Sequence, residues 1–237
     1  MNGVPKKAFI LAAGFGERMR PLTLNCPKPL LAVDGKPMLD RILDRLAEAG
    51  VEEVVVNTHY LGDMIAAHVA DRKKPRVTVS HEDKLLETAG GVNKMISFFG
   101  DEPFYVFNAD VVWTDGKVPT LKALAEKWDD AKMDLLLLLH ACVKGGDYYL
   151  PDGSDQPQFA KGVGKTPNYR FSGPRIVHPR LFKGAPQGKL GFLDLFHKAE
   201  RAGRLYALRH DGEFYHVGTP QELEETNRLL KEQRERP

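Results

Sequence analysis

Short apolar runs alternate with amphipathic helical patterns along residues 8–140, and this alternation limits the possible folds more than any other feature. Strand-like apolar runs occur at 8–11, 53–57, 76–80, 104–108 and 134–140. Helical patterns fall between them at 38–46, 61–69, 90–99 and 121–128. Strands alternating with helices indicate βαβ units. Continuous apolar runs such as Leu135–Leu139 fit strands buried on both faces, so we expect an α/β fold with a mostly parallel sheet.

The second half of the chain is less regular. Residues 145–173 are rich in Gly, Pro, Asp and Lys, a composition that favours hairpins or loops over a site. A helix is expected at 192–202, a strand at 205–209 and a helix at 220–235. We see no internal repeat and no linker. A length of 237 residues suits one domain, so a single domain over 1–237 is predicted.

Composition disfavours several functional classes. The 34 Lys+Arg and 32 Asp+Glu give a net charge of +2, which argues against a broad basic surface for nucleic acid. The apolar stretches fall far short of the roughly 20 residues that span a bilayer, and the run at 8–13 is too short for a signal peptide. The two cysteines, Cys26 and Cys142, make neither a disulfide framework nor a zinc site. We therefore expect a cytoplasmic protein without nucleic-acid or membrane partners.

A glycine-rich segment follows the first expected strand. It reads LAAGFGERMRPLT over 11–23 and continues as PKPL over 27–30. Backbone N–H groups in such a turn can approach phosphates closely, and Arg18, Arg20 and Lys28 can add the positive charge that a triphosphate needs. The segment is not a Walker A loop, and Met19 stands where a Rossmann fingerprint has its third glycine. Taken alone, the segment is also compatible with a tight βα turn whose arginines are exposed to solvent.

The whole string resembles the signature of the sugar-1-phosphate nucleotidylyltransferases, also called nucleotide-sugar pyrophosphorylases. The resemblance covers nearly the whole chain and extends to ETAGG at 87–91, NAD at 108–110, FSG at 171–173 and VGTP at 217–220. It implies a Rossmann-like αβα sandwich with an irregular C-terminal sugar-binding part. It also implies an enzyme that joins an NTP to a sugar 1-phosphate and releases pyrophosphate, with a divalent ion, Mg²⁺ or else Mn²⁺, as cofactor.

Length and motif order are most similar to the branch that uses UTP and N-acetylmuramate 1-phosphate in bacterial cell-wall recycling. One alternative is a guanylyltransferase that uses GTP with mannose 1-phosphate or heptose 1-phosphate. A second is a regulatory or binding homologue with weak catalysis. An oxidoreductase that uses a dinucleotide is disfavoured by the missing fingerprint glycine. A monomer or small homo-oligomer is expected.

The resemblance also assigns the nucleotide site. The expected nucleotide-binding residues are Leu11, Ala12, Ala13, Gly14, Gly16, Glu17, Arg18, Lys28, Glu87, Ala89 and Gly90. Arg18 and Lys28 match phosphate-contacting positions. Cations are needed there because the attacking sugar phosphate and the α-phosphate are both anions. The sugar phosphate is already ionised at neutral pH, so no general base is expected. The segment 87–91 resembles a base-reading loop, although a helix N-cap at Thr88 is an alternative.

The remaining site residues follow from the same resemblance. Asp110, just past an expected strand, is the first candidate metal ligand, and with Arg18 and Lys28 it completes the expected catalytic set. The candidate residues for the acceptor sugar are Asn108, Asp147, Ser172 and Gly173. Residues up to about 140 are expected to bind the nucleotide, about 141–219 the acceptor, and 220–237 to form a C-terminal helix.

One position departs from the family. His216 stands where the pattern W-x-D-x-G-T has a second metal-ligating aspartate. Imidazole suits manganese, cobalt or zinc better than magnesium. His216 therefore binds a softer metal, contacts phosphate directly, or is inert while Asp110 and the phosphates hold the ion, and these three readings stay open. This substitution is also the feature that favours the homologue with weak catalysis.

Overall fold

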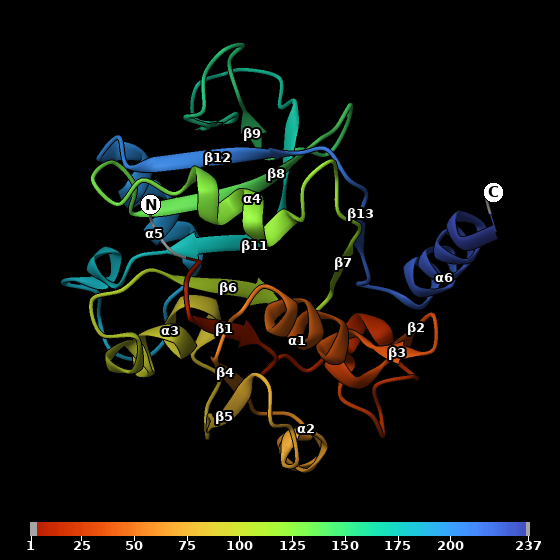
Figure 1. The fold of residues 1–237 in the computed structure, drawn as a ribbon. Helices are drawn as coiled ribbons and strands as arrows, with labels where there is room; N and C mark the ends of the chain where they lie inside the picture. Colours follow the sequence, from red (N-terminus) through yellow and green to blue (C-terminus); the bar gives the residue numbers. More distant parts are fainter. Residues whose placement is uncertain (1–3, 236–237) are drawn as a thin grey trace.

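A mixed sheet runs through the computed structural model, which describes residues 4–235 (Figure 1). Its main strands, in spatial order, are β12 (Leu205–His210), β8 (Leu135–Ala141), β11 (Tyr169–Val177), β6 (Phe104–Asn108), β1 (Lys7–Leu11), β4 (Glu53–Thr58) and β5 (Arg76–His81). β1 pairs in parallel with β4 and β6, β4 with β5, and β8 with β12. Only β11, antiparallel to β6 and β8, opposes the other main strands. The expected mostly parallel sheet is confirmed.

Helices cover both faces of this sheet. The helices are α1 (Met38–Glu48), α2 (Gly62–Val69), α3 (Glu87–Lys94), α4 (Thr120–Lys127), α5 (Phe192–Arg201) and α6 (Pro220–Glu235). Within β1, Ile10 packs in the core cluster that contains the apolar faces of α1, α2 and α4. Its neighbour Phe9 packs in the cluster of α3 and α5, and both side chains are buried. Successive strand residues point to opposite faces, so this burial explains the continuous apolar runs and confirms the αβα sandwich.

Several short elements were not predicted. β2 (Ala32–Val33) pairs with β3 (Lys36–Pro37), and β7 (Val111–Trp113) pairs with β13 (Phe214–His216). The 3-10 helices are η1 (Glu17–Met19), η2 (Lys28–Leu30), η3 (Ile96–Phe99) and η4 (Pro179–Phe182). The helix expected over 90–99 is therefore wrong in extent, because α3 ends at Lys94 and η3 follows as a separate 3-10 helix.

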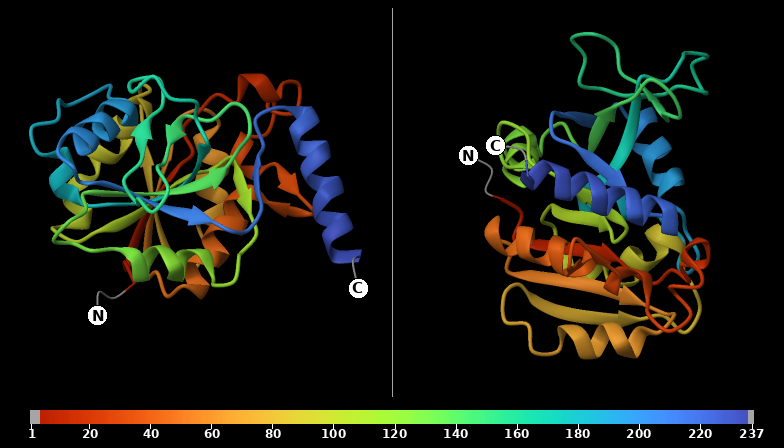
Figure 2. Two further views of the ribbon diagram at one scale, coloured as in Figure 1. Left: turned by 90° about the horizontal axis from the view of Figure 1, so that it is seen from above. Right: turned by 90° about the vertical axis from the view of Figure 1, so that its right-hand side faces the viewer.

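The irregular region expected between 145 and 173 is a projecting hairpin that leads into a long strand. β9 (Tyr148–Tyr149) and β10 (Gln158–Phe159) form the hairpin, which pairs with the start of β11. The segment between β8 and β11 extends beyond the sheet (Figure 2). α6 lies at another side of the molecule, where Leu230 packs with Met19, Val33 and Val217. Among the helices of residues 4–235, none is both long and apolar enough to cross a membrane.

The strand register brings three chain segments together at one edge of the sheet. Leu11, at the end of β1, is level with Asn57 of β4 and with Asn108 of β6. The chain passes from β1 to β4 on one side and later returns to β6 on the other. Ligands of open α/β sheets bind outside the carboxyl ends of strands at such a reversal of strand order.

Candidate active site

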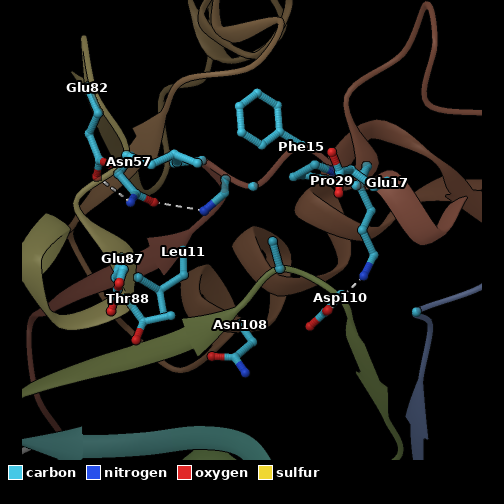
Figure 3. A pocket seen from close by; sticks show the side chains of 18 of the residues that line it. Leu11, Phe15, Glu17, Pro29, Asn57, Glu82, Glu87, Thr88, Asn108 and Asp110 are labelled. Atoms are coloured by element: carbon cyan, nitrogen blue, oxygen red, sulfur yellow. Dashed lines mark hydrogen bonds and ion pairs between the residues drawn. The ribbon is translucent and has the colours of Figure 1, made fainter. Parts of the chain in front are cut away.

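A cavity of about 670 Å³ opens at these strand ends (Figure 3). It brings together nine of the eleven residues expected to bind the nucleotide, the metal candidate Asp110 and the acceptor candidate Asn108, whereas His216 is not part of its lining. Those in the lining are Leu11, Ala12, Ala13, Gly14, Gly16, Glu17, Arg18, Lys28, Glu87, Asn108 and Asp110. The lining also contains residues that were not predicted to bind, among them Phe15, Pro29, Asn57, Glu82, Leu85, Thr88 and Gly218.

The glycine-rich loop folds back tightly on itself. Gly16 has φ +65°, and a Cβ there would lie 3.0 Å from Cγ2 of Thr23 and 3.2 Å from Cβ of Lys28. The Thr23 hydroxyl donates a 2.8 Å hydrogen bond to the Gly16 carbonyl. Only glycine adopts this left-handed backbone without strain while letting both side chains approach. The tight turn therefore places Lys28 beside the start of the loop.

Lys28 and Asp110 meet in an ion pair at the cavity. Nζ of Lys28, on η2, lies 2.7 Å from Oδ2 of Asp110, which follows β6. Nε2 of His216 lies 3.4 Å from the same oxygen. Burial opposes ionisation of Asp110, but the hydrogen bond from His216 and the charge and hydrogen bond of Lys28 outweigh it and hold the pKa of Asp110 well below its usual value. Asp110 is therefore a carboxylate at neutral pH.

His216 reaches Asp110 because of the strand pair that the sequence did not reveal. In the β7–β13 ladder His216 is opposite Val111, the residue after Asp110. Nδ1 of His216 lies 3.6 Å from Oε2 of Glu222, and that oxygen accepts a 2.7 Å hydrogen bond from the Gly218 N–H. The imidazole thus lies between two carboxylates, at the position that the family pattern gives to a metal ligand.

Asp110 offers a carboxylate oxygen to a divalent ion whose other ligands would come from the substrates. In the part of the chain that the structure describes, no group of three or more His, Cys, Asp or Glu side chains could hold an ion. Magnesium is usually bound by one or two carboxylates together with phosphates and water, and it seldom needs an all-protein cage. Asp110 supplies one hard oxygen ligand of this kind, and His216 is the adjacent nitrogen donor.

A buried hydrogen-bond chain that sequence reasoning missed links the glycine-rich loop to the segment before α3 (Figure 3). Oδ1 of Asn57 accepts a 2.8 Å hydrogen bond from the Ala12 N–H, and Nδ2 of Asn57 donates to Oε1 of Glu82 at 2.7 Å. Oε2 of Glu82 accepts from the Leu86 N–H at 3.0 Å. A usable signal was present, because Asn57 ends the expected strand next to the one that carries the loop.

The prediction for 87–91 needs a correction. Glu87 lines the cavity, but Ala89 and Gly90 do not, and both of their N–H groups donate to the Leu190 carbonyl at 2.9 Å. A Cβ on Gly90 would collide with the Gly188 carbonyl oxygen. The glycine at 90 therefore allows close packing of the 188–190 segment, and the N–H groups of Ala89 and Gly90 are not free to read a base.

The alternative for Thr88 is also wrong. α3 begins at Glu87, its N-cap residue is Leu86, and no side chain caps it. The Thr88 hydroxyl oxygen instead accepts a 3.1 Å hydrogen bond from the Phe192 N–H at the start of α5. This contact joins the segment that borders the cavity to the second half of the chain.

Of the four acceptor candidates, only Asn108 lines the cavity. Ser172 lies inside the sheet with no exposed surface, and its hydroxyl donates to the Leu138 carbonyl at 2.7 Å. Gly173 is buried too, and its carbonyl accepts a 2.8 Å hydrogen bond from Arg175. Asp147 is exposed on the projecting hairpin, outside the lining. The Ser172 side chain is therefore not placed to contact a ligand.

Known proteins are similar to this chain in sequence. The family described as nucleotidyl transferase matches residues 7–142. The N-acetylmuramate alpha-1-phosphate uridylyltransferase of Caulobacter vibrioides is 35% identical over 93% of this chain and 95% of its own length. That of Neisseria meningitidis is 36% identical over 94% of this chain and 97% of its own length. Mannose-1-phosphate guanyltransferase beta-B of Xenopus laevis is 39% identical, but over only 45% of this chain and 31% of its own length.

Solved structures agree on the fold. The inositol-1-phosphate CTP transferase of T. maritima superposes with a TM-score of 0.80 at 17% identity, covering 99% of this chain and 98% of that chain. HddC of Yersinia pseudotuberculosis complexed with GMP-PN gives a TM-score of 0.76 at 22% identity, covering 94% of this chain and 99% of that chain. From the match over 7–142 and the similarity to relatives over nearly its full length, the chain belongs to the nucleotidyl transferase family.

Proposed function

We propose that this protein transfers the uridylyl group of UTP to N-acetylmuramate 1-phosphate and releases pyrophosphate. One observation carries the choice of substrates. The two relatives with this named activity match at 35% and 36% identity over nearly their whole length. The guanyltransferase match extends over only 111 residues, 45% of this chain. Among these three relatives, only the uridylyltransferases match nearly the whole chain, including the part that is expected to meet the acceptor.

The reaction needs positive charge more than it needs a base. A phosphate oxygen of the sugar 1-phosphate forms a bond to the α-phosphorus of UTP, and the bond from that phosphorus to the bridging oxygen of the β-phosphate breaks. Pyrophosphate leaves with the electron pair. Lys28 and Arg18 offset the repulsion between the two anions and stabilise the charge on the equatorial and leaving oxygens. The N–H groups of the loop around Gly14 bind phosphate oxygens beside them.

We infer that Asp110 holds the divalent ion of this family and that His216 is its neighbouring donor. Magnesium, when bound, neutralises phosphate charge as a Lewis acid. Asp110 suits this role because it is ionised and lies at the cavity, 2.7 Å from Lys28. Manganese is the alternative ion, favoured by the nitrogen of His216.

We further propose that one domain divides the work along the chain. Residues up to about 140 bind the nucleotide, in line with the family match over 7–142. Residues of about 141–219 meet the acceptor, and the C-terminal helix packs against the outside of the nucleotide part through the cluster around Leu230. Because both substrates are small soluble metabolites, we infer a cytoplasmic enzyme, monomeric or a small homo-oligomer, without nucleic-acid or membrane partners.

The proposal is tested by pyrophosphate release with four NTPs against several sugar 1-phosphates. Turnover should be highest for UTP with N-acetylmuramate 1-phosphate. The second candidate is a guanylyltransferase, favoured by the 39% identity over 111 residues. A clear preference for GTP with mannose 1-phosphate would select it. Absence of turnover with every pair would support a homologue with weak catalysis instead.

A further inference from the structure

Arg175 is a buried cation that forms no ion pair with any carboxylate of residues 4–235. The residue is 1% exposed, and its Nε has no hydrogen-bond partner. The guanidinium carbon lies 4.1 Å from the ring centre of Phe192, 5.3 Å from that of Phe171 and 5.9 Å from that of Phe196. Cation–π contact offsets only part of the cost of burying such a charge. An apolar side chain would fill this space at lower cost, so packing alone does not account for an arginine here.

The register of the sheet explains what Arg175 reaches. In the β11–β6 ladder Arg175 is opposite Val106, and Asn108 lies two residues further along β6, on the same face of the sheet. Nη1 of Arg175 donates to Oδ1 of Asn108 at 3.1 Å and to the Gly173 carbonyl at 2.8 Å. Burial lowers the pKa of Arg175 to about 9, which leaves it protonated at pH 7.

This contact fixes the orientation of the Asn108 side-chain amide, that is, where its oxygen and its nitrogen point. A guanidinium has only donors, so the carboxamide must turn its oxygen toward Arg175 and its nitrogen away from it. Asn108 lines the cavity, and among the residues drawn in Figure 3 none accepts from its nitrogen. A hydrogen bond from a charged donor also polarises the amide and makes its N–H groups better donors.

We propose that Arg175 is a positioning residue that holds the Asn108 carboxamide with its N–H₂ end toward the cavity, as a donor to the acceptor sugar 1-phosphate. The identity of the acceptor rests on the proposed function. Asn108 is two residues from Asp110, so this donor lies beside the Lys28–Asp110 pair, where the acceptor must approach the nucleotide. The residue acts through Asn108 and does not itself line the cavity.

The test separates the two substrates. KM for UTP and KM for the acceptor are measured by pyrophosphate release for the wild type, Arg175→Met, Arg175→Lys, Asn108→Ala and the double variant Asn108→Ala/Arg175→Met. Arg175→Met should raise the acceptor KM about tenfold, the effect of one ordinary hydrogen bond, and leave the UTP KM within about twofold. In the Asn108→Ala background Arg175→Met should have no further effect. Arg175→Lys, which keeps a charged donor, should recover part of the loss.

Arg204→Met is the matched control. Arg204 pairs with Asp134 at 2.7 Å, away from the cavity lining, so its loss should leave both KM values unchanged. Equal increases of both KM values in Arg175→Met, or effects of Asn108→Ala and Arg175→Met that multiply in the double variant, would overturn the proposal.

Asn108→Asp keeps the proposal testable if Arg175→Met does not fold. The aspartate gives Arg175 a counter-ion but removes the amide donor. We expect a melting temperature a few degrees above that of the wild type together with a raised acceptor KM. An unchanged melting temperature with an unchanged acceptor KM would overturn the role of Arg175. If the wild type turns over no sugar 1-phosphate, the proposed function itself fails; if the wild type is active and the variants match it, only this inference fails.

Discussion

Nζ of Lys28 lies 2.7 Å from Oδ2 of Asp110, although the two residues are 82 positions apart in the sequence. The glycine-rich turn places the lysine, and the end of β6 places the aspartate. The cation assigned to the phosphates and the carboxylate assigned to the metal thus contact each other directly. Removing either one leaves the charge of the other without its partner, so their effects on activity should not be independent.

Loss of either predicted phosphate-binding cation should reduce turnover strongly. Lys28→Ala and Arg18→Ala should each lower kcat about a hundredfold or more, the scale of a lost electrostatic stabiliser. Arg20→Ala is the control. Arg20 belongs to the same segment, but it is exposed and does not line the cavity, and its Nη2 lies 3.9 Å from Oε1 of Glu17. Steady-state pyrophosphate release measures the effect. Near-normal turnover in a folded Lys28→Ala or Arg18→Ala variant would contradict the assigned role.

Asp110→Asn should abolish metal-dependent activity, because the amide keeps the shape of the carboxylate but loses its charge. His216→Asp should lower the ratio of the rate in Mn²⁺ to the rate in Mg²⁺, since an oxygen ligand suits the harder ion. Because both rates are measured on the same protein, their ratio does not depend on how much of the variant is folded. If the ratio in His216→Asp equals that of the wild type, His216 does not touch the ion.

The buried hydrogen bond from Asn57 to Glu82 should affect the binding of UTP. Glu82→Ala leaves the Asn57 amide and the Leu86 N–H without their acceptor, at a cost of about 1–3 kcal/mol. The melting temperature should fall by several degrees, and KM for UTP should rise more than KM for the acceptor. Glu126→Ala, at an exposed helix position, is the control. Equal changes in both KM values would argue against a nucleotide-positioning role.

His178 should make stability depend on pH. It is 3% exposed, and its Nδ1 accepts the Arg180 N–H at 3.1 Å. Burial, helped by the charge of Arg180, lowers the pKa of His178. Below about pH 6.5 the unfolded chain therefore binds a proton that the folded chain resists, so the free energy of unfolding falls as pH falls.

His178→Asn keeps an acceptor at this cap but removes the titration. Denaturant unfolding of both proteins between pH 7.5 and 5 should show wild-type stability falling toward that of the variant by up to about 1.4 kcal/mol for each pH unit. A constant difference between the two curves would show that His178 does not titrate differently in the folded and unfolded states.

The apolar patterns predicted the main strands except β11, because most of these strands place runs of apolar residues in the core. The short pairs β2–β3 and β7–β13 carry no such periodicity, since two or three residues cannot display a period. β11 was hidden by the Gly, Pro and Lys of the segment that precedes it. The first three residues of β11, Tyr169 to Phe171, are partly or fully exposed, and the residues after Phe171 are buried.

The cavity lining was predictable where it comes from one local segment, as in the loop from Leu11 to Lys28. It was not predictable where a distant segment decides the role of a residue. Ala89 and Gly90 look like free loop residues until the segment at Leu190 takes their N–H groups. Arg175 is one arginine among many in the sequence, and its burial against Asn108 follows only from the pairing of β11 with β6.

The central claim is transfer of UMP to N-acetylmuramate 1-phosphate, and a substrate competition tests it most directly. The enzyme is given UTP and GTP together with N-acetylmuramate 1-phosphate and mannose 1-phosphate, and the nucleotide sugars are resolved by mass. UDP-N-acetylmuramate should dominate the products, with one pyrophosphate released for each molecule formed. GDP-mannose as the main product would contradict the proposed substrates.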